Sequence, residues 1–225
     1  MLAVAASLRH VMPELVRTFV ENNGGSEIVV TYGGSGTLRG QVEAGAPVDA
    51  VVFAGGPPVD QLIEAGYADA KSRRVVAINT LVLIAPSGSE PVSFQTIERV
   101  PASEKIAIGD PVSVPVGIYA AEAFRNLGKW EALQDRLVFG GHVGAVLTYA
   151  RRGEVAVAVV YRTDAQGLED VVVLDEARGA WAPQPEVVAV VTNGGVAAAR
   201  ATAFLDFLGS PRGREILERY GFRAS

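Results

Sequence analysis

Residues 29–56 read VVTYGGSGTLRGQVEAGAPVDAVVFAGG, and their pattern indicates the fold class of the chain. A β-branched run enters a turn of three glycines and one serine, a helical pattern leaves the turn, and a second β-branched run follows. Strand, helix and strand in this order are typical of α/β proteins with largely parallel sheets. The turn exposes backbone N–H groups at a helix start, so it can bind a phosphate, a dinucleotide or a free anion. Its serine could instead be a nucleophile.

The same alternation continues along the chain on both sides of this stretch. Strands are expected at residues 2–7, 26–32, 49–55, 80–86, 105–110, 155–161 and 186–193. Helices are expected at residues 8–24, 36–45, 57–67, 116–133 and 144–153, with one or two more over 197–222. Extended segments at residues 79–86 and 185–192 suggest two α/β lobes between which the chain crosses twice. A ligand is then expected in the cleft between the lobes.

Composition excludes several classes of protein. Of the 225 residues, 49% are hydrophobic and 20% charged, which provides a buried core and excludes a disordered chain. The net charge is −5 and the Lys and Arg residues are scattered, so nucleic acid is not expected as a partner. The chain has no cysteine, which excludes a disulfide or a thiolate nucleophile, and its two histidines offer little for a metal site.

A dinucleotide-binding interpretation rests on Gly34, Gly36 and Gly40, which follow a strand as G-x-G-x-x-x-G. That motif expects an acid at the end of the next strand, but Asp49 stands at the beginning of that strand. The chain has no GK[ST] sequence, so a Walker phosphate loop is excluded.

A serine hydrolase would need glycine two residues after Ser35, where the chain has Thr37. Neither His10 nor His142 has an orienting acid at a recognisable spacing, and a solvated or capping role is expected for both. An enzyme built on the Gly34–Ser35–Gly36 turn, using a nucleotide cofactor or a hydrolytic mechanism, therefore remains only an alternative.

Four strand-to-helix junctions resemble one another: those at Ser7 and Ser35, and those before Ile118 and Ala145. Each begins a helix with small or hydroxyl residues, and several converging helix starts form an anion site without Lys or Arg. Any single serine at such a junction also has a plain interpretation as a helix N-cap.

Six motifs, in this order, carry a resemblance to a known family: AAS-L near the start, SGTLRGQVEAGAPVDAVV, NTLVL, IAIGDPVSVPVGIYA, VVYRTDA and the closing YGF. Over essentially the whole chain, they resemble the periplasmic molybdate-binding proteins that serve ABC transporters. The resemblance implies a two-lobed type II periplasmic binding fold with two crossover hinge strands and mixed, mostly parallel sheets flanked by helices. It implies one discontinuous lobe of residues 1–80 with 189–225, a second lobe of residues 81–188, and an oxyanion buried between them.

The resemblance also implies which residues bind the oxyanion, with no catalytic residue and no cofactor. Two serines donate hydroxyl and backbone hydrogen bonds, two helix starts donate a backbone N–H, and one of two tyrosines completes the shell. These residues are ligands of the oxyanion rather than of a bare metal ion, and they are Ser7, Ser35, Val116, Val143, Tyr161 and Tyr119.

This chain departs from the family pattern in three places. It reads AGG at residues 54–56 where many relatives read SAD, Val116 replaces alanine, and Arg9 replaces asparagine or threonine. A shell of donors without a carboxylate suits a fully deprotonated tetrahedral dianion. The resemblance implies that this dianion is molybdate or tungstate, and sulfate is the alternative.

The implied partner is the membrane permease of an ABC transporter, and the implied location is periplasmic or extracytoplasmic although no signal peptide is visible. We expect a monomer whose lobes close on the anion. Asp164 is expected to cap a helix and Asp110 to organise its turn. Ser35→Ala is expected to weaken binding while leaving the ligand-free protein nearly as stable.

Overall fold

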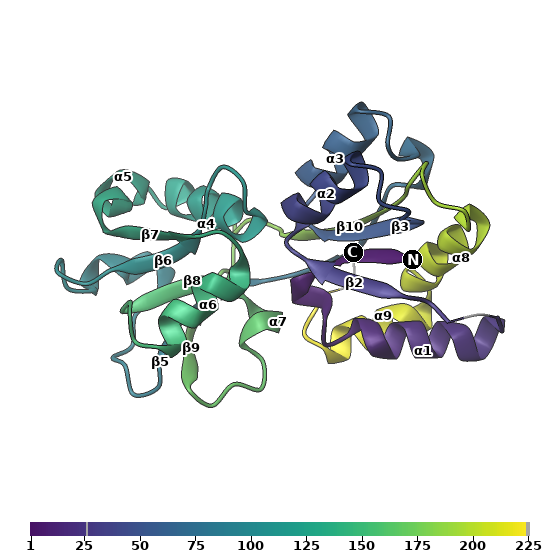
Figure 1. Cartoon of the computed structure of the whole chain (residues 1–225). Helices are drawn as coiled ribbons and strands as arrows, with labels where there is room; N and C mark the ends of the chain where they lie inside the picture. The colour runs from purple at the N-terminus through teal and green to yellow at the C-terminus, as the bar shows by residue number, and fades with distance from the viewer. Residues whose placement is uncertain (26, 224–225) are drawn as a thin grey trace. The chain divides into compact units, whose positions relative to one another are not determined.

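The structure, a computed structural model, describes residues 1–25 and 27–223 (Figure 1). It divides into two compact units, Met1–Asn79 with Glu186–Ser225 and Thr80–Pro185. We call them unit 1 and unit 2. Each contains a five-stranded sheet flanked by helices, so the α/β fold class and the mixed, mostly parallel sheets are confirmed.

Unit 1 has the strand order β2-β1-β3-β10-β4. Strand β1 pairs in parallel with both β2 and β3, whereas β10 is antiparallel to β3 and β4. Its elements are β1 (Leu2–Ala5), α1 (Met12–Asn23), β2 (Val30–Gly33), α2 (Ser35–Glu43), β3 (Ala50–Ala54), α3 (Pro57–Glu64), β4 (Arg74–Ile78), β10 (Glu186–Val191), α8 (Ala198–Leu208) and α9 (Pro211–Arg219), with 3₁₀ helices at Ala6–Leu8 and Ala70–Ser72.

Unit 2 has the strand order β7-β6-β8-β5-β9. Strand β6 pairs in parallel with β7 and β8, whereas β5 is antiparallel to β8 and β9. Its elements are β5 (Leu81–Pro86), β6 (Ile106–Gly109), α4 (Pro115–Asn126), α5 (Trp130–Leu133), β7 (Leu137–Gly140), α6 (Val143–Arg151), β8 (Val157–Tyr161), α7 (Arg162–Ala165) and β9 (Val171–Glu176), with 3₁₀ helices at Phe94–Arg99 and Gln134–Arg136.

Helices cover both faces of the central strands, which explains the continuous apolar sequence of those strands. In unit 1, α2 and α3 lie on one face of the sheet and α1, α8 and α9 lie on the other (Figure 1). All five residues of β3 are buried, as expected for a strand that packs on both faces. On the α1 side, Phe19 packs edge-on against Phe204 with ring centroids 5.3 Å apart.

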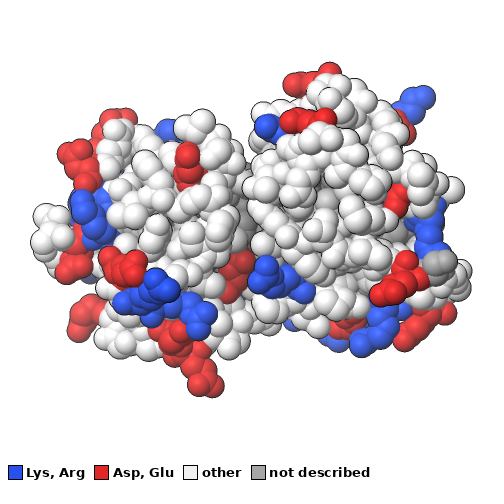
Figure 2. Space-filling view, in the orientation of Figure 1, with Lys and Arg blue, Asp and Glu red and all other residues white. Residues whose placement is uncertain are grey.

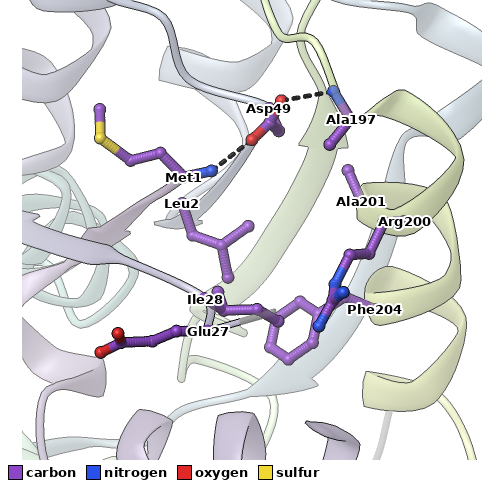
Figure 3. A pocket seen from close by; sticks show the side chains of 9 residues that line it. All are labelled: Met1, Leu2, Glu27, Ile28, Asp49, Ala197, Arg200, Ala201 and Phe204. Atoms are coloured by element: carbon purple, nitrogen blue, oxygen red, sulfur yellow. Dashed lines mark hydrogen bonds and ion pairs between the residues drawn. The ribbon is translucent and has the colours of Figure 1, made fainter. Parts of the chain in front are cut away.

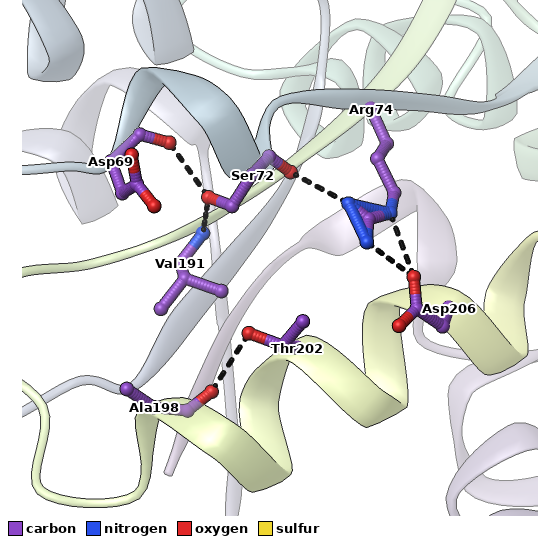
Figure 4. Close-up of polar contacts among 7 residues, drawn as sticks. All are labelled: Asp69, Ser72, Arg74, Val191, Ala198, Thr202 and Asp206. Carbon is purple, nitrogen blue, oxygen red and sulfur yellow. Dashed lines mark hydrogen bonds and ion pairs between the residues drawn. The ribbon is translucent and has the colours of Figure 1, made fainter.

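Polar contacts join the antiparallel strands of unit 1 to the helix layer (Figure 4). The Ser72 hydroxyl accepts a hydrogen bond from the Val191 N–H at 2.9 Å and donates one to the Asp69 carbonyl at 2.7 Å. The Arg74 guanidinium binds the Asp206 carboxylate on α8. These contacts hold β4, β10 and α8 together at the side of the sheet farthest from β2.

The structure corrects several element boundaries. The first helix begins at Met12 rather than residue 8, because residues 6–8 form a 3₁₀ helix and Pro13 occupies the first turn of α1. The helix expected over residues 116–133 is two helices, separated at Gly128, whose φ of 67° is left-handed. The strand expected over residues 26–32 is shorter at its start: β2 runs from Val30 to Gly33, and residues 27–29 are not part of it. Ser26 lies outside the described residues.

Three strands had no sequence prediction: β4, β7 and β9. The two segments expected to cross between lobes largely form β5 and β10, each of which is a full member of one sheet. The chain therefore passes between the units at residues 79–80 and 185–186.

Candidate functional site

The carboxyl ends of the parallel strands bring Ser7 and Ser35 to the same edge of the unit 1 sheet. Strands β1 and β2 are in register from Leu2 with Val30 to Ala5 with Gly33, so they end side by side. Ser7 lies in the 3₁₀ helix after β1 and Ser35 is the first residue of α2 after β2. Both serines are buried, with 5% and 4% of their surface exposed.

Neither serine is a helix N-cap, so the interpretation of these two residues as N-caps is wrong. The N-cap positions are Ala5 and Gly34, and no side-chain capping bond forms at either helix. The Ser7 hydroxyl has no hydrogen-bond partner among the described residues. A buried hydroxyl without a partner is uncommon and marks a place where a ligand can bind.

The Ser35 hydroxyl has a different environment. Its oxygen accepts a hydrogen bond of 3.2 Å from the Ala54 N–H at the end of β3. The first helical bond of α2 joins the Leu38 N–H to the Gly34 carbonyl, so the N–H groups of the preceding turn have no intrahelical acceptor. The hydrogen bond to Ala54 argues against the expectation that Ser35→Ala leaves the stability nearly unchanged.

In unit 2, the start of α4 presents one backbone donor. Pro115 has no N–H and the Gly117 N–H donates to the Val114 carbonyl at 2.8 Å, so the Val116 N–H is the donor of this turn without an intrahelical acceptor. The helix start lies tightly against β6: a Cβ atom on Gly117 would lie 2.1 Å from the Gly109 carbonyl oxygen. Glycine at position 117 thus allows the helix to begin directly at the strand end.

The turn before α4 is organised by Asp110, as expected. Its carboxylate accepts a hydrogen bond from the Val112 N–H at 2.8 Å, which forms an Asx turn. The loop between β6 and α4 is thereby fixed in place by a local contact.

The start of α6 is capped by His142, which is one of the two roles, solvated or capping, expected for this histidine. Its Nδ1 accepts a hydrogen bond from the Ala145 N–H at 3.1 Å. The carbonyl of His142 accepts from Ala145 and Val146, so the N–H groups of Val143 and Gly144 have no intrahelical acceptor. Since β6 and β7 end in register at Gly109 and Gly140, α4 and α6 begin at the same edge of the sheet.

Tyr161 ends β8 at this same edge of unit 2 and is 2% exposed. Its hydroxyl has no hydrogen-bond partner among the residues described. Burial raises its pKa well above the usual value, and the neighbouring Tyr119 and Asp164 raise it further. The phenol is therefore protonated near neutral pH and can donate a hydrogen bond.

The helix-capping role expected for Asp164 is wrong. Asp164 lies within α7 rather than capping it, since Tyr161 is the N-cap of that helix. A carboxylate therefore lies near the donors of unit 2, which were expected to have none. The spacing of three residues from Tyr161 was the available signal, because residues three apart on a helix are neighbours.

The structure thus gathers the predicted residues in two groups, each at the carboxyl edge of one sheet. Unit 1 brings Ser7 and Ser35 together. Unit 2 brings together the N–H groups of Val116 and Val143 and the phenol of Tyr161, with Tyr119 beside it. Helix starts and hydroxyl groups of this kind suit an anion that needs no positive side chain. The ligand cleft expected between the lobes stays a prediction.

Two residues of the enzymatic alternatives, Gly40 and His10, lie in surroundings that do not match those alternatives. A Cβ atom on Gly40 would meet nothing within 4 Å, so this glycine does not serve the close helix–strand packing of a dinucleotide motif. His10 lies in a turn before α1 rather than on the helix. Among residues 1–25 and 27–223, no group of three His, Asp or Glu side chains could hold a metal ion.

Unit 1 also contains a cavity of about 220 Å³ at the other edge of its sheet (Figure 3). Leu2, at the start of β1, and Phe204, on α8, line it, and Asp49 closes one side. Burial raises the pKa of the Asp49 carboxyl, but hydrogen bonds from the chain's amino terminus and from the N–H groups of Ala197 and Val196 leave this pKa below its usual value. The carboxylate thus holds the start of α8, and the cavity contains none of the predicted anion ligands.

The charged side chains on the displayed face are interspersed, with acidic and basic groups next to each other on both units (Figure 2). In the part of the chain that is described, no helix has the length and apolar character needed to cross a membrane.

Comparisons with known proteins place this architecture in one class. The family model of bacterial extracellular solute-binding proteins matches residues 1–223. The molybdate-binding protein ModA of Escherichia coli (strain K12) is 33% identical over 97% of this chain and 86% of its own. The putative ABC transporter substrate-binding lipoprotein YvgL of Bacillus subtilis (strain 168) is 32% identical over 99% of this chain and 85% of its own.

A solved structure supports the same class of protein. The substrate binding domain of a putative molybdenum ABC transporter from Clostridium difficile has a TM-score of 0.76 and 28% identity, covering 100% of this chain and 97% of its own. The two-lobed fold is therefore that of the periplasmic solute-binding proteins. The chain belongs to the bacterial extracellular solute-binding protein family. It is a solute-binding protein of the extracytoplasmic space and not an enzyme, so the enzymatic alternatives are set aside.

Proposed function

We propose that this protein captures a fully deprotonated tetrahedral oxyanion, molybdate or tungstate, and delivers it to the membrane permease of an ABC transporter. The ligands are the hydroxyl and backbone donors of Ser7 and Ser35 in unit 1, and those of Val116, Val143 and Tyr161 in unit 2. The names of the relatives from Escherichia coli and Clostridium difficile support this choice of ligand and partner. Tyr119, on α4, lies near enough to raise the pKa of the Tyr161 phenol and is the second tyrosine that the resemblance implies as a ligand.

The observation that supports the proposal most strongly is that two hydroxyl groups are buried without a hydrogen-bond partner among the described residues. The two groups are the hydroxyls of Ser7 and Tyr161. Leaving one such group unsatisfied costs about 1–3 kcal/mol. An anion with four acceptor oxygens removes this cost at both positions, and both residues are among those that the sequence resemblance selects as ligands.

The charge state of the ligand follows from the donor set. Burial and the charge of Asp164 keep the Tyr161 phenol protonated, so it donates to an oxygen rather than accepting from one. Helix starts at α2, α4 and α6 add partial positive charge and N–H donors. Molybdate, tungstate and sulfate accept from all of these donors, whereas phosphate carries a proton that needs an acceptor.

The test is a calorimetric titration of the protein with molybdate, tungstate, sulfate and phosphate at neutral pH. We expect tight binding of molybdate or tungstate, weaker binding of sulfate and no measurable binding of phosphate. Tight phosphate binding would indicate that Asp164 acts as an acceptor and would contradict the dianion assignment. Absence of binding by all four anions would contradict the function itself.

A matched pair of variants ties the binding to the proposed residues. Tyr161→Phe removes the buried donor and should weaken molybdate binding about tenfold or more, the effect of losing one hydrogen bond to a charged group. Tyr67→Phe makes the same chemical change at an exposed tyrosine of unit 1 and should leave binding unchanged.

Delivery of the anion to the permease and the oligomeric state of the protein are tested by two further measurements. Molybdate uptake into proteoliposomes that contain the cognate permease should require this protein and should be reduced for Tyr161→Phe. We propose a monomer, which light scattering on the purified protein will test, and a mass twice that of the chain would contradict it.

A further inference from the structure

Arg9 is a cation at the edge of unit 1 that holds Ser7 and Ser35. It follows the 3₁₀ helix Ala6–Leu8 directly, and its N–H donates to the Ala6 carbonyl at 3.1 Å, so its backbone is fixed two residues after Ser7. Its side chain is exposed.

The guanidinium of Arg9 makes no ion pair and no hydrogen bond with the residues that the structure describes. Two other arginines of unit 1 show the usual arrangement: Arg39 pairs with Glu43 at 3.2 Å, and Arg73 pairs with Asp60 at 2.7 Å. No carboxylate among the described residues therefore neutralises the charge of Arg9.

The position of this charge is indicated by its effect on Tyr32. Burial raises the pKa of the Tyr32 phenol, and the positive charge of Arg9 opposes part of that shift. Tyr32 lies on β2 opposite Val4 of β1 and three residues before Ser35. The charge of Arg9 thus acts on the β1–β2 pair whose carboxyl ends carry both serines, and its backbone lies two residues after Ser7.

We propose that Arg9 attracts the incoming dianion to the donor edge of unit 1 and so raises its association rate, without being one of the residues that contact the bound anion. This role rests on the proposed function. Arg9 thus determines the association rate of the ligand and how strongly that rate depends on ionic strength.

The need for such a cation follows from the overall charge. The chain has a net charge of −5, which repels a dianion at long range. For a unit charge and a dianion about 8 Å apart in water, Coulomb's law corresponds to about a fivefold change in encounter rate. Salt at about 0.5 M reduces the screening length to roughly half that separation and removes most of the effect.

The experiment is stopped-flow measurement of molybdate association at ionic strengths from about 0.02 to 0.5 M, a range over which the screening length falls severalfold. The variants are Arg9→Gln, Arg9→Lys and Arg17→Gln. Arg17 is an exposed arginine on α1 in the same unit, so its replacement changes the net charge equally at a different place. Melting temperatures of all variants check that the fold is intact.

For Arg9→Gln we expect an association rate about threefold to tenfold lower at low ionic strength and equal to wild type at high ionic strength. Arg9→Lys should retain the wild-type salt dependence, and Arg17→Gln should remain close to wild type throughout. The dissociation rate should change little, because Arg9 does not contact the bound anion.

Three results would overturn the role of Arg9, and they are distinct from a failure of the proposed function. Equal rates and salt slopes for wild type and Arg9→Gln would show that the charge does not act. A loss that persists at high ionic strength, or that lysine does not restore, would indicate a direct contact or a structural role. If wild type binds no oxyanion, the proposed function fails and the role of Arg9 fails with it.

Discussion

The Ser35 hydroxyl accepts a hydrogen bond from the buried Ala54 N–H at 3.2 Å, which ties the first residue of α2 to the end of β3. A serine hydroxyl has one hydrogen and two lone pairs. Because one lone pair of Ser35 is used by Ala54, its hydrogen is directed elsewhere and remains free to be donated. Ser35 thus combines a structural role with the donor role that the proposed function requires.

Ser35→Ala is therefore predicted to have two effects. The buried Ala54 N–H loses its acceptor, which should lower the free energy of unfolding of the ligand-free protein by about 1–3 kcal/mol. Molybdate binding should also weaken, because a donor is lost. Denaturant unfolding measures the first effect and calorimetry the second. A variant as stable as wild type would show that water replaces the serine oxygen at Ala54.

Ser7→Ala is predicted to behave differently, although the same atom is removed. The Ser7 hydroxyl has no partner within the described structure, so its loss leaves no protein group unsatisfied. The free energy of unfolding should stay unchanged or rise by up to about 1 kcal/mol, while molybdate binding weakens about tenfold. The same two measurements apply. A loss of stability equal to that of Ser35→Ala would mean that Ser7 is a structural residue.

The pKa of Tyr161 predicts an alkaline limit of stability. Its pKa is raised in the folded protein, mainly by burial, above the ordinary value of 10.0. Above that pH, the unfolded chain loses the phenolic proton while the folded protein keeps it. The unfolded state then binds fewer protons, and the free energy of unfolding falls by about 1.4 kcal/mol per pH unit.

The measurement is denaturant unfolding between about pH 9 and 11, a window set by the ordinary tyrosine pKa. Tyr161→Phe should show a shallower decline than wild type, whereas Tyr67→Phe, at an exposed tyrosine, should decline as wild type does. Identical slopes for wild type and Tyr161→Phe would mean that the phenol ionises freely in the folded protein.

An element could be predicted from the sequence when its own residues were sufficient to indicate it. Strand β3 was predicted because all five of its residues are apolar and buried by helices on both faces. Strand β7 was missed because it lies at the edge of the sheet, where Phe139 is half exposed and the strand is not buried throughout. Strand β9 was missed because its exposed valines and acidic end do not form a continuous buried run.

The residues of the candidate site could also be predicted where a local sequence signal marks them. The turns around Ser35 and Val116 were readable because a glycine-rich or proline-containing helix start is a local signal. The nearness of Asp164 to Tyr161, and the lack of an ion pair between Arg9 and any other described residue, depend on which side chains meet in the folded chain. No local pattern specifies such meetings, so the structure was needed to find them.

Gly117→Ala is predicted to damage the unit 2 site through the backbone. The added Cβ atom would lie 2.1 Å from the Gly109 carbonyl oxygen and 2.7 Å from that of Asp110, and neither backbone atom can move aside as a flexible side chain would. The start of α4 must shift away from β6, which should lower the free energy of unfolding by about 3 kcal/mol and displace the Val116 N–H.

Gly40→Ala is the matched control, because Gly40 is also a helical glycine but an added Cβ there meets nothing within 4 Å. Alanine favours the helix, so this variant should be more stable than wild type by about 0.5–1 kcal/mol and should bind molybdate normally. Denaturant unfolding and calorimetry compare the two variants. If Gly117→Ala were as stable as Gly40→Ala, the close contact between α4 and β6 would not be required for the Val116 N–H to face the anion.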